Sequence, residues 1–427
     1  MGEEYSFELL ENNVKLYKKY KMFAYDWVFF YAISVLFFSI TKNFSTSQIV
    51  YLSAFYTLAY CIFQIPGNFL VKKIGLRKSI ILGNILSTIT ILMYIFFKSF
   101  DAFVIAQFIN GLSFALKGLA ESDILCSSMK RLGKFDKFSK VEGASNARYY
   151  FFDAIASIIS GFAFTLNEYL PVILCLIVTI IALIASFKFN DVKLDIEPGE
   201  KKSIIKSINN FFRTLSSNRL KSIYLVAFVF TGIIQVVITL YKSVLIDMGM
   251  ATEYITMLVF FYVAFLGIGS KLEFYLEKLT KKKTLTFITI VYITSLGIFG
   301  LFGLLGILNL TTLSSIILLL SIMGFLQGAY KVALKKYTIS FTTSKIRTRI
   351  TSIGLMFEYA GTTIISFVAA YLLEHTTNSL ACVIICVIGL IVMMGIIKYM
   401  DGRLGLKPEE YSKEERKYDE LKEIEKL

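Results

Sequence analysis

The sequence predicts an all-α polytopic membrane protein, with about twelve transmembrane helices in two pseudo-symmetric six-helix bundles. The first observation behind this prediction is composition, since 56% of the 427 residues are hydrophobic, 18% are charged and the mean hydropathy is +0.66. A soluble domain needs more polar surface than this. The second is the recurrence of long apolar windows, and the third is similarity between the two halves of the chain.

The apolar windows define the predicted helices in order. A bilayer core of about 30 Å requires about 20 apolar residues in a helix. Such windows occupy residues 22–41, 48–71, 79–98, 102–125, 146–166, 170–189, 222–246, 252–272, 284–307, 311–334, 350–373 and 379–400. The predicted domains are therefore an N-terminal bundle at 1–189 and a C-terminal bundle at 222–400. Between and after them, 190–221 is expected to be a cytoplasmic linker with an amphipathic helix and 401–427 a charged cytoplasmic tail.

Basic residues mark one side of the membrane. They gather in alternate loops, at Lys72, Lys73, Arg77 and Lys78, then around 130–140, 281–283 and 335–349. Because short basic loops stay in the cytoplasm, both termini are predicted to be cytoplasmic, and the plasma membrane is the expected location. The net charge of +14 then reflects topology and attraction to anionic lipid rather than nucleic-acid binding.

Residues that would support catalysis or metal binding are scarce. The five cysteines lie in or at the ends of apolar windows, and the one histidine, His375, falls in an outer loop. There is no paired histidine, no nucleophile beside a histidine and no Gly-rich phosphate loop. We therefore expect no enzyme activity, no metal and no cofactor. A lipid scramblase or a membrane-embedded enzyme remains the alternative from another class.

The halves of the chain align with each other. Residues 145–162 (SNARYYFFDAIASIISGF) and 351–368 (TSIGLMFEYAGTTIISFV) share Phe, Ala and the run Ile-Ile-Ser in register. Residues 71–78 (VKKIGLRK) likewise lie opposite 276–283 (LEKLTKKK). Internal repeats of this kind are typical of secondary transporters.

Two stretches carry a family resemblance. Residues 64–79 (QIPGNFLVKKIGLRKS) resemble the loop between the second and third helices of the major facilitator superfamily. The matching positions are Lys73, Gly75, Arg77 and Lys78, and the departures are Asn68, Lys72 and Leu76. Residues 111–143 resemble the fourth helix and following loop of a bacterial branch, with Glu121, Glu142 and Gly143 matching. The resemblance implies two bundles around a central cavity that opens alternately to each side.

The resemblance to proton-coupled drug exporters is weaker. Those proteins carry an Arg in the fourth helix where this chain has Gln107, and a Gly-Pro pair in the fifth where it has Ser160-Gly161. The motifs therefore support the fold more strongly than drug–proton antiport.

Charged residues inside the windows are the candidates for a substrate or coupling cavity, because each is costly in hydrocarbon. Glu358 lies roughly 12 Å from the inner end of its window, and Asp153 holds nearly the same level in the other half. Asp26 lies nearer the inner end of the first window, where an interfacial acid beside Trp27 is the alternative. Lys117 and Glu121 share a helix face, so they form either a local ion pair or part of the cavity.

The inner loops supply the candidate gating residues. In the superfamily an Asp in the loop after the second helix is thought to face the positive end of a helix in the opposite half. Lys72 has the wrong sign for this role, but it aligns with Glu277 in the repeat. We therefore predict that Glu277 faces Arg148 at the inner end of the fifth window. A pair between Glu277 and Lys281 is the alternative. The remaining gating candidates are Lys73, Gly75, Arg77 and Glu142.

The resulting functional prediction is a monomeric secondary active transporter working by alternating access. The many Phe and Tyr residues favour export of a small amphipathic or apolar compound, with protons as the candidate coupling ion. A facilitator or importer of a polar metabolite is the alternative.

Overall fold

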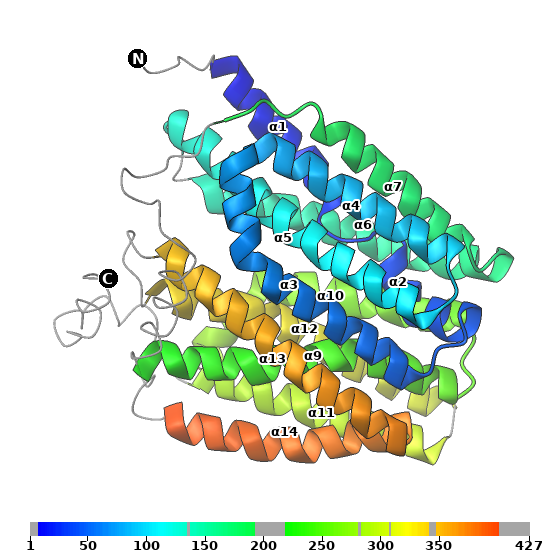
Figure 1. The fold of residues 1–427 in the computed structure, drawn as a ribbon. Helices are drawn as coiled ribbons and strands as arrows, with labels where there is room; N and C mark the ends of the chain where they lie inside the picture. The colour runs from blue at the N-terminus through cyan, green and yellow to red at the C-terminus, as the bar shows by residue number, and fades with distance from the viewer. Residues whose placement is uncertain are drawn as a thin grey trace. The chain divides into compact units, whose positions relative to one another are not determined.

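The computed structural model describes residues 7–134, 137–192, 218–280, 283–306, 309–340 and 347–400. Nearly all of these residues are helical, because a helix satisfies every backbone hydrogen bond within an apolar segment. The predicted linker helix and the tail lie outside the described residues, apart from the linker's first and last few positions. Figure 1 shows the helices in chain order.

The first half of the described chain contains eight helical elements, and four of them are long and apolar enough to span a membrane. The eight are α1 (Phe7–Ala24), α2 (Phe30–Leu36), the π-helix η1 (Phe37–Thr41), α3 (Thr46–Ile74), α4 (Leu76–Phe96), α5 (Phe100–Arg131), α6 (Phe138–Leu166) and α7 (Leu170–Ser186). The second half contains six helices. These are α9 (Asn218–Asp247), α10 (Thr252–Thr280), α11 (Thr284–Leu305), α12 (Leu310–Ser340), α13 (Arg347–His375) and α14 (Asn378–Met400).

These helices confirm the predicted fold class. Ten helices of the described chain are long and apolar enough to cross a membrane, and Phe30–Thr41 and Leu170–Ser186 are shorter apolar helices. Each of the twelve predicted windows overlaps one of them. No strand occurs in the described residues.

The first predicted window is corrected in one respect. We expected a continuous helix over 22–41, but residues 25–29 are not helical and separate α1 from α2. The residues before the window are helical as well, since α1 begins at Phe7. Its buried residues are Leu10, Asn13, Tyr17, Tyr20 and Ala24, a spacing that places one helix face against neighbours.

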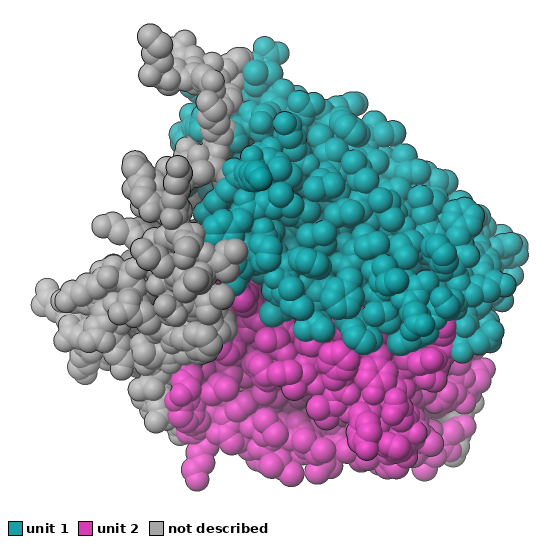
Figure 2. All heavy atoms as spheres, in the orientation of Figure 1, with its two compact units in different colours: residues 1–43, 55–201, 252–260 teal, residues 44–54, 202–251, 261–427 magenta. Residues whose placement is uncertain are grey.

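The described chain divides into two compact units, coloured separately in Figure 2. Unit 1 comprises residues 1–43, 55–201 and 252–260, and unit 2 comprises 44–54, 202–251 and 261–427. The boundaries at 189 and 222 stay a prediction.

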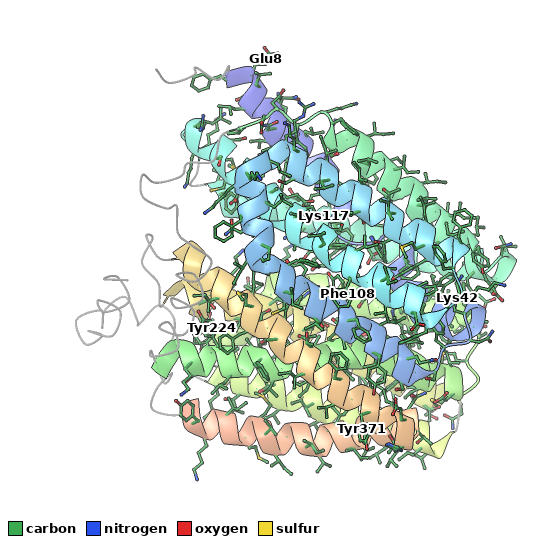
Figure 3. All side chains as sticks on the ribbon, in the orientation of Figure 1. Glu8, Lys42, Phe108, Lys117, Tyr224 and Tyr371 are labelled. Atoms are coloured by element: carbon green, nitrogen blue, oxygen red, sulfur yellow. The ribbon has the colours of Figure 1, made fainter. Side chains whose placement is uncertain are left out.

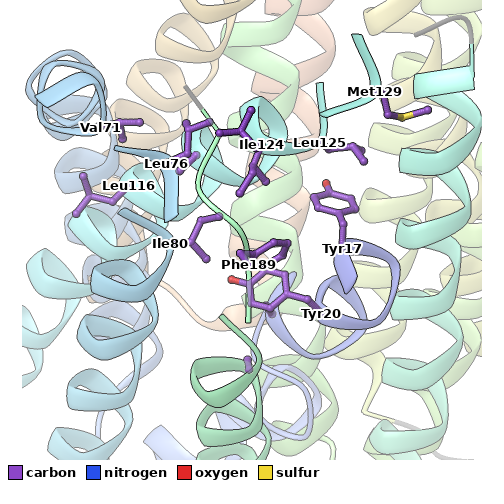
Figure 4. Close-up of a cluster of buried hydrophobic side chains, with 14 of the residues drawn as sticks. Tyr17, Tyr20, Val71, Leu76, Ile80, Leu116, Ile124, Leu125, Met129 and Phe189 are labelled. Carbon is purple, nitrogen blue, oxygen red and sulfur yellow. The ribbon is translucent and has the colours of Figure 1, made fainter. Parts of the chain in front are cut away.

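The interior of unit 1 contains an apolar cluster built from α1, α3, α4, α5, α7 and the chain after α7. Figure 4 shows Tyr17 and Tyr20 of α1 in this cluster together with Phe189. The Tyr20 and Phe189 rings meet edge-on, with centroids 5.2 Å apart. Burial of these large rings fixes α1 against the rest of the unit and so positions the break that follows it.

Candidate functional site

The break between α1 and α2 is the most irregular backbone in unit 1. Phe29 has a φ of 70°, in the left-handed region that bulky residues rarely adopt. Interruptions of this kind leave backbone groups without helical partners, and side chains must satisfy them. In transporters, interrupted helices often form substrate and ion sites.

Side chains from three other helices hold the break. Lys117 Nζ of α5 donates a hydrogen bond to the carbonyl of Ala24 at 3.2 Å, at the C-terminal end of α1. Ser160 Oγ of α6 donates to the carbonyl of Phe29 at 2.8 Å. The indole Nε1 of Trp27 donates to Ser87 Oγ of α4 at 2.9 Å. A lysine at the negative end of a helix dipole is electrostatically favourable.

Asp26 lies in the middle of the break and is exposed. Its Oδ1 accepts a hydrogen bond from the backbone N–H of Trp27 at 2.7 Å. Its charge acts on the hydroxyls of Tyr56, Tyr149 and Tyr150, so the carboxylate stands among aromatic residues. The sequence prediction that Asp26 contributes to a cavity is compatible with this surrounding.

Tyrosine rings from α6 pack against the start of the break. The centroid of the Tyr25 ring lies 4.6 Å from that of Tyr149 and 5.6 Å from that of Tyr150. The hydroxyls of Tyr25 and Tyr150 are 3.2 Å apart. Rings of this kind present an apolar face and a polar edge, which suits amphipathic molecules.

Asp153 lies on α6 near the same tyrosines. It is 3% exposed, and its charge acts on Tyr149 and Tyr150 as that of Asp26 does. The thiol of Cys175 on α7 experiences the charges of Asp26, Asp153 and Lys117 together. The structure therefore gathers three of the five cavity candidates in one region of unit 1.

Glu121 does not form the local pair with Lys117 that the sequence suggested. Its Oε2 accepts from Lys21 Nζ of α1 at 2.5 Å, and its Oε1 accepts from Tyr20 Oη at 2.7 Å. Asn84 Nδ2 of α4 donates to the same tyrosine oxygen at 2.8 Å. Because Lys21 precedes the first predicted window, its partnership with Glu121 was not predicted. The helical spacing of the α1 residues named above is the signal that could have revealed it.

Glu358 belongs to unit 2. Its side chain is half-buried on α13, and its charge and that of Lys331 on α12 act on each other. The charge of Glu358 also acts on Tyr330, whose hydroxyl lies 3.2 Å from that of Thr231. Its predicted role in coupling stays a prediction.

The loop between α3 and α4 is the tight basic turn that the sequence predicted. Gly75 has a φ of 93°, which glycine adopts without strain. Arg77 Nη2 donates to the carbonyl of Phe187 at 2.8 Å, and Lys72 and Lys73 are exposed. Although Lys72 replaces the expected acid, a carboxylate is nearby, since a Cβ on Gly75 would lie 3.5 Å from Asp191 Oδ2.

The other gating candidates lie on two different helices, α10 and α6. Glu277 is 6% exposed on α10, and its Oε2 pairs with Lys336 Nζ of α12 at 3.0 Å. The same ammonium pairs with Glu273 at 2.6 Å. Glu142 is half-buried and Arg148 is exposed, both on α6. Lys281 lies outside the described residues. The expected approach of Glu277 to Arg148 joins the two units and stays a prediction.

The fold and the buried charges define a polytopic helical membrane protein with a polar site inside one unit. The profile of the Major Facilitator Superfamily matches residues 22–292, and the chain belongs to this superfamily of transporters. Among curated proteins, none matches the sequence.

Solved transporter structures share the fold. A mutant of the nucleoside transporter NupG superposes with a TM-score of 0.76 at 9% identity, covering 91% of this chain and 99% of that one. A POT family transporter in complex with a thioalcohol-conjugated peptide gives 0.71 at 13% identity, covering 93% and 96%. A D-xylose–proton symporter gives 0.66 at 14% identity, covering 92% and 98%. At these identities the likeness concerns the fold alone.

Proposed function

We propose that the protein is a secondary active transporter that exports a small amphipathic compound by alternating access, driven by protons. The observation that carries the proposal is the exposed carboxylate of Asp26 at a helix break beside tyrosine rings. A carboxylate attracts a positively charged group, and aromatic faces bind both cations and apolar surface. Asp26 is therefore the polar contact, and the tyrosines form the apolar wall.

Proton coupling requires a carboxyl group that is desolvated in one state. Asp153 is buried beside the proposed substrate contact, and Glu358 is the corresponding candidate in unit 2. If this carboxylate gains a proton as the substrate leaves the site, proton binding and substrate release are coupled. The proton and the substrate then cross the membrane in opposite directions.

Import or facilitated diffusion of a polar metabolite is the second candidate. The α5 face that bears Gln107, Asn110, Lys117 and Glu121 favours it, because all four polar side chains are buried inside the unit. A nucleoside transporter and a D-xylose–proton symporter, both polar-solute carriers, share the fold.

Purified protein in proteoliposomes tests the proposal. A pH gradient should drive movement of an amphipathic amine, a sodium gradient alone should not, and inside-out vesicles should accumulate it. Asp26→Asn should raise KM, whereas Asp153→Asn or Glu358→Gln should uncouple transport from pH. If no compound of a mixed amphipathic and polar panel moves in response to either gradient, the proposal is wrong. If sugars or nucleosides move inward and amines do not, the second candidate replaces it.

A further inference from the structure

Lys117 is a buried cation with incomplete hydrogen bonding. Its side chain is 3% exposed, its Nζ makes one hydrogen bond to the carbonyl of Ala24, and it lies 3.9 Å from the centroid of the Phe114 ring. An ammonium group has three N–H donors. Within the described part of the chain the other two donors meet no hydrogen-bond acceptor, although the charges of Glu121 and Asp26 act on the ammonium.

Another buried lysine of unit 1 is better satisfied. Lys42 donates to the carbonyl of Phe97 at 2.9 Å and to Tyr169 Oη at 3.3 Å. It also lies over the rings of Phe37, Phe103 and Tyr169. Buried charges are normally paired or fully hydrogen-bonded, because desolvation without compensation is costly. Lys117 departs from this rule, so its free donors indicate a missing anionic partner.

The ammonium and the Asp26 carboxylate stand at the same helix break. Lys117 holds Ala24, which precedes Asp26 by two residues, and the charge of Asp26 acts on Lys117. The Phe114 ring under the ammonium lies 6.4 Å from the ring of Trp27, centroid to centroid. The break therefore offers one negative group, one positive group with unused donors, and aromatic faces beside them.

The geometry points to a zwitterionic amphipathic substrate of the α-amino acid type. Its ammonium group binds Asp26, its carboxylate accepts hydrogen bonds from Lys117, and its apolar side chain packs on the neighbouring rings. Charge-assisted hydrogen bonds of this kind are the strong ones. The assignment rests on the proposed function, because it adds a second contact to the Asp26 site. If Lys117 only caps α1, the carboxylate of a ligand would not increase the binding affinity.

Trp27 provides a direct readout, because it is the only tryptophan in the chain and lies next to Asp26. The probes share a phenyl group: L-phenylalanine carries both charges, 2-phenylethylamine the positive one and 3-phenylpropanoate the negative one. In purified full-length protein, L-phenylalanine should change Trp27 emission with a Kd about tenfold lower than either single-charge probe. In the Asp26→Asn variant, the affinity for L-phenylalanine should no longer exceed the affinity for 3-phenylpropanoate.

Lys117→Gln and Lys117→Arg separate binding from capping. Gln keeps an N–H donor for Ala24 but loses the charge. In this variant L-phenylalanine should therefore bind no more tightly than 2-phenylethylamine, and the affinity for 2-phenylethylamine should stay within about twofold of the wild-type value. Arg should preserve most of the advantage. Elution volume and melting temperature report whether each variant is folded.

Three results would overturn the assignment. They are equal affinity of the wild-type protein for amino acid and amine, an undiminished preference in folded Lys117→Gln, and no response to any of the three probes. Transport assays separate the two proposals. If the amine is transported in an Asp26-dependent way and Lys117 has no effect, the zwitterion assignment fails while the proposed transport function stands.

Discussion

Glu121 is one half of a buried ion pair, and its loss should be costly. Its side chain is 2% exposed and that of Lys21 is 13% exposed. Glu121→Gln leaves a buried ammonium without its counter-charge, so we expect a loss of about 3–5 kcal/mol in the free energy of unfolding. Lys21→Met should cost a similar amount, and the double variant should cost less than the sum. Thermal or denaturant unfolding in detergent measures all three.

Glu11 and Lys134 supply the matched control for this pair. They also link α1 to the turn that follows α5, at 2.9 Å, but their side chains are 45% and 51% exposed. Exposed pairs contribute little because water and salt screen them. Glu11→Gln should therefore leave the melting temperature unchanged. Equal effects of Glu11→Gln and Glu121→Gln would contradict the view that burial sets the strength of the Glu121 pair.

Lys42, which directly follows the first membrane segment at the end of η1, should make stability depend on pH. Burial, with the charge of Lys98 added, lowers the pKa of Lys42 to about 8, below its ordinary value of 10.5. The unfolded chain therefore holds this proton more tightly between pH 8 and about 10.4, and there stability should rise with pH. Below pH 8 both states are protonated and Lys42 adds no dependence.

A difference measurement isolates this residue. Melting temperatures of wild-type protein and Lys42→Met are compared from pH 7 to 10, and the wild-type protein should gain stability relative to the variant as pH rises through 8. Lys98→Gln should move that rise to higher pH, because it removes a like charge. A constant difference across the range would refute the lowered pKa.

The membrane helices could be predicted well from sequence, and the break in the first of them could not. A window average records only how apolar a segment is, and residues 22–41 are mostly apolar, with Asp26 as the one charged residue. The break depends on groups distant in sequence, namely Lys117, Ser160 and Ser87, which bind the backbone and indole of residues 24–29. For the same reason the sequence located Asp26, Asp153 and Lys117 as candidates but did not predict that their charges act on one common neighbour, Cys175.

Close contact between α10 and α12 should be sensitive to a single methyl group. A Cβ on Gly269 would overlap the backbone carbonyl of Phe325 on α12, whereas a Cβ on Gly267 would meet nothing within 4 Å. Small residues allow membrane helices to approach closely. Gly269→Ala should therefore cost about 1–3 kcal/mol through overpacking.

Gly267→Ala is the control on the same helix. Alanine favours a helix over glycine by about 1 kcal/mol, so this variant should be neutral or slightly stabilised. Both variants are compared by melting temperature and by yield of folded protein. If Gly269→Ala is as stable as Gly267→Ala, the contact is looser than the structure indicates.

The apolar windows predicted the membrane helices because the bilayer imposes helix length and apolarity on each of them. They say less about the partners of individual charges. Glu277 was expected to act as a latch from its place in the repeat, yet within unit 2 it shares Lys336 with Glu273. Lys336 could not be assigned from sequence, because its pairing depends on how α10 and α12 pack.

The start of α3 and the end of α13 meet inside unit 2 although they come from different halves of the sequence. Ser47 Oγ donates to the carbonyl of Ala370 at 2.8 Å and lies 3.5 Å from Glu374 Oε1. If the predicted bundles, 1–189 and 222–400, move against each other during transport, this contact must open. Asp247 and Asn378 also meet, with Asn378 Nδ2 donating to Asp247 Oδ2 at 2.7 Å, but both lie in the predicted second bundle.

Cross-linking can therefore test the predicted bundles. In a background without the five native cysteines, Ser47→Cys with Glu374→Cys and Asp247→Cys with Asn378→Cys are each treated with a short bifunctional thiol reagent. Both pairs should cross-link in the liposome-reconstituted protein. The first cross-link should reduce transport by about tenfold or more, because it joins bodies that must separate, whereas the second should leave it within about twofold. Reduced activity with both pairs, or with neither, would contradict the predicted division of the chain into moving bundles.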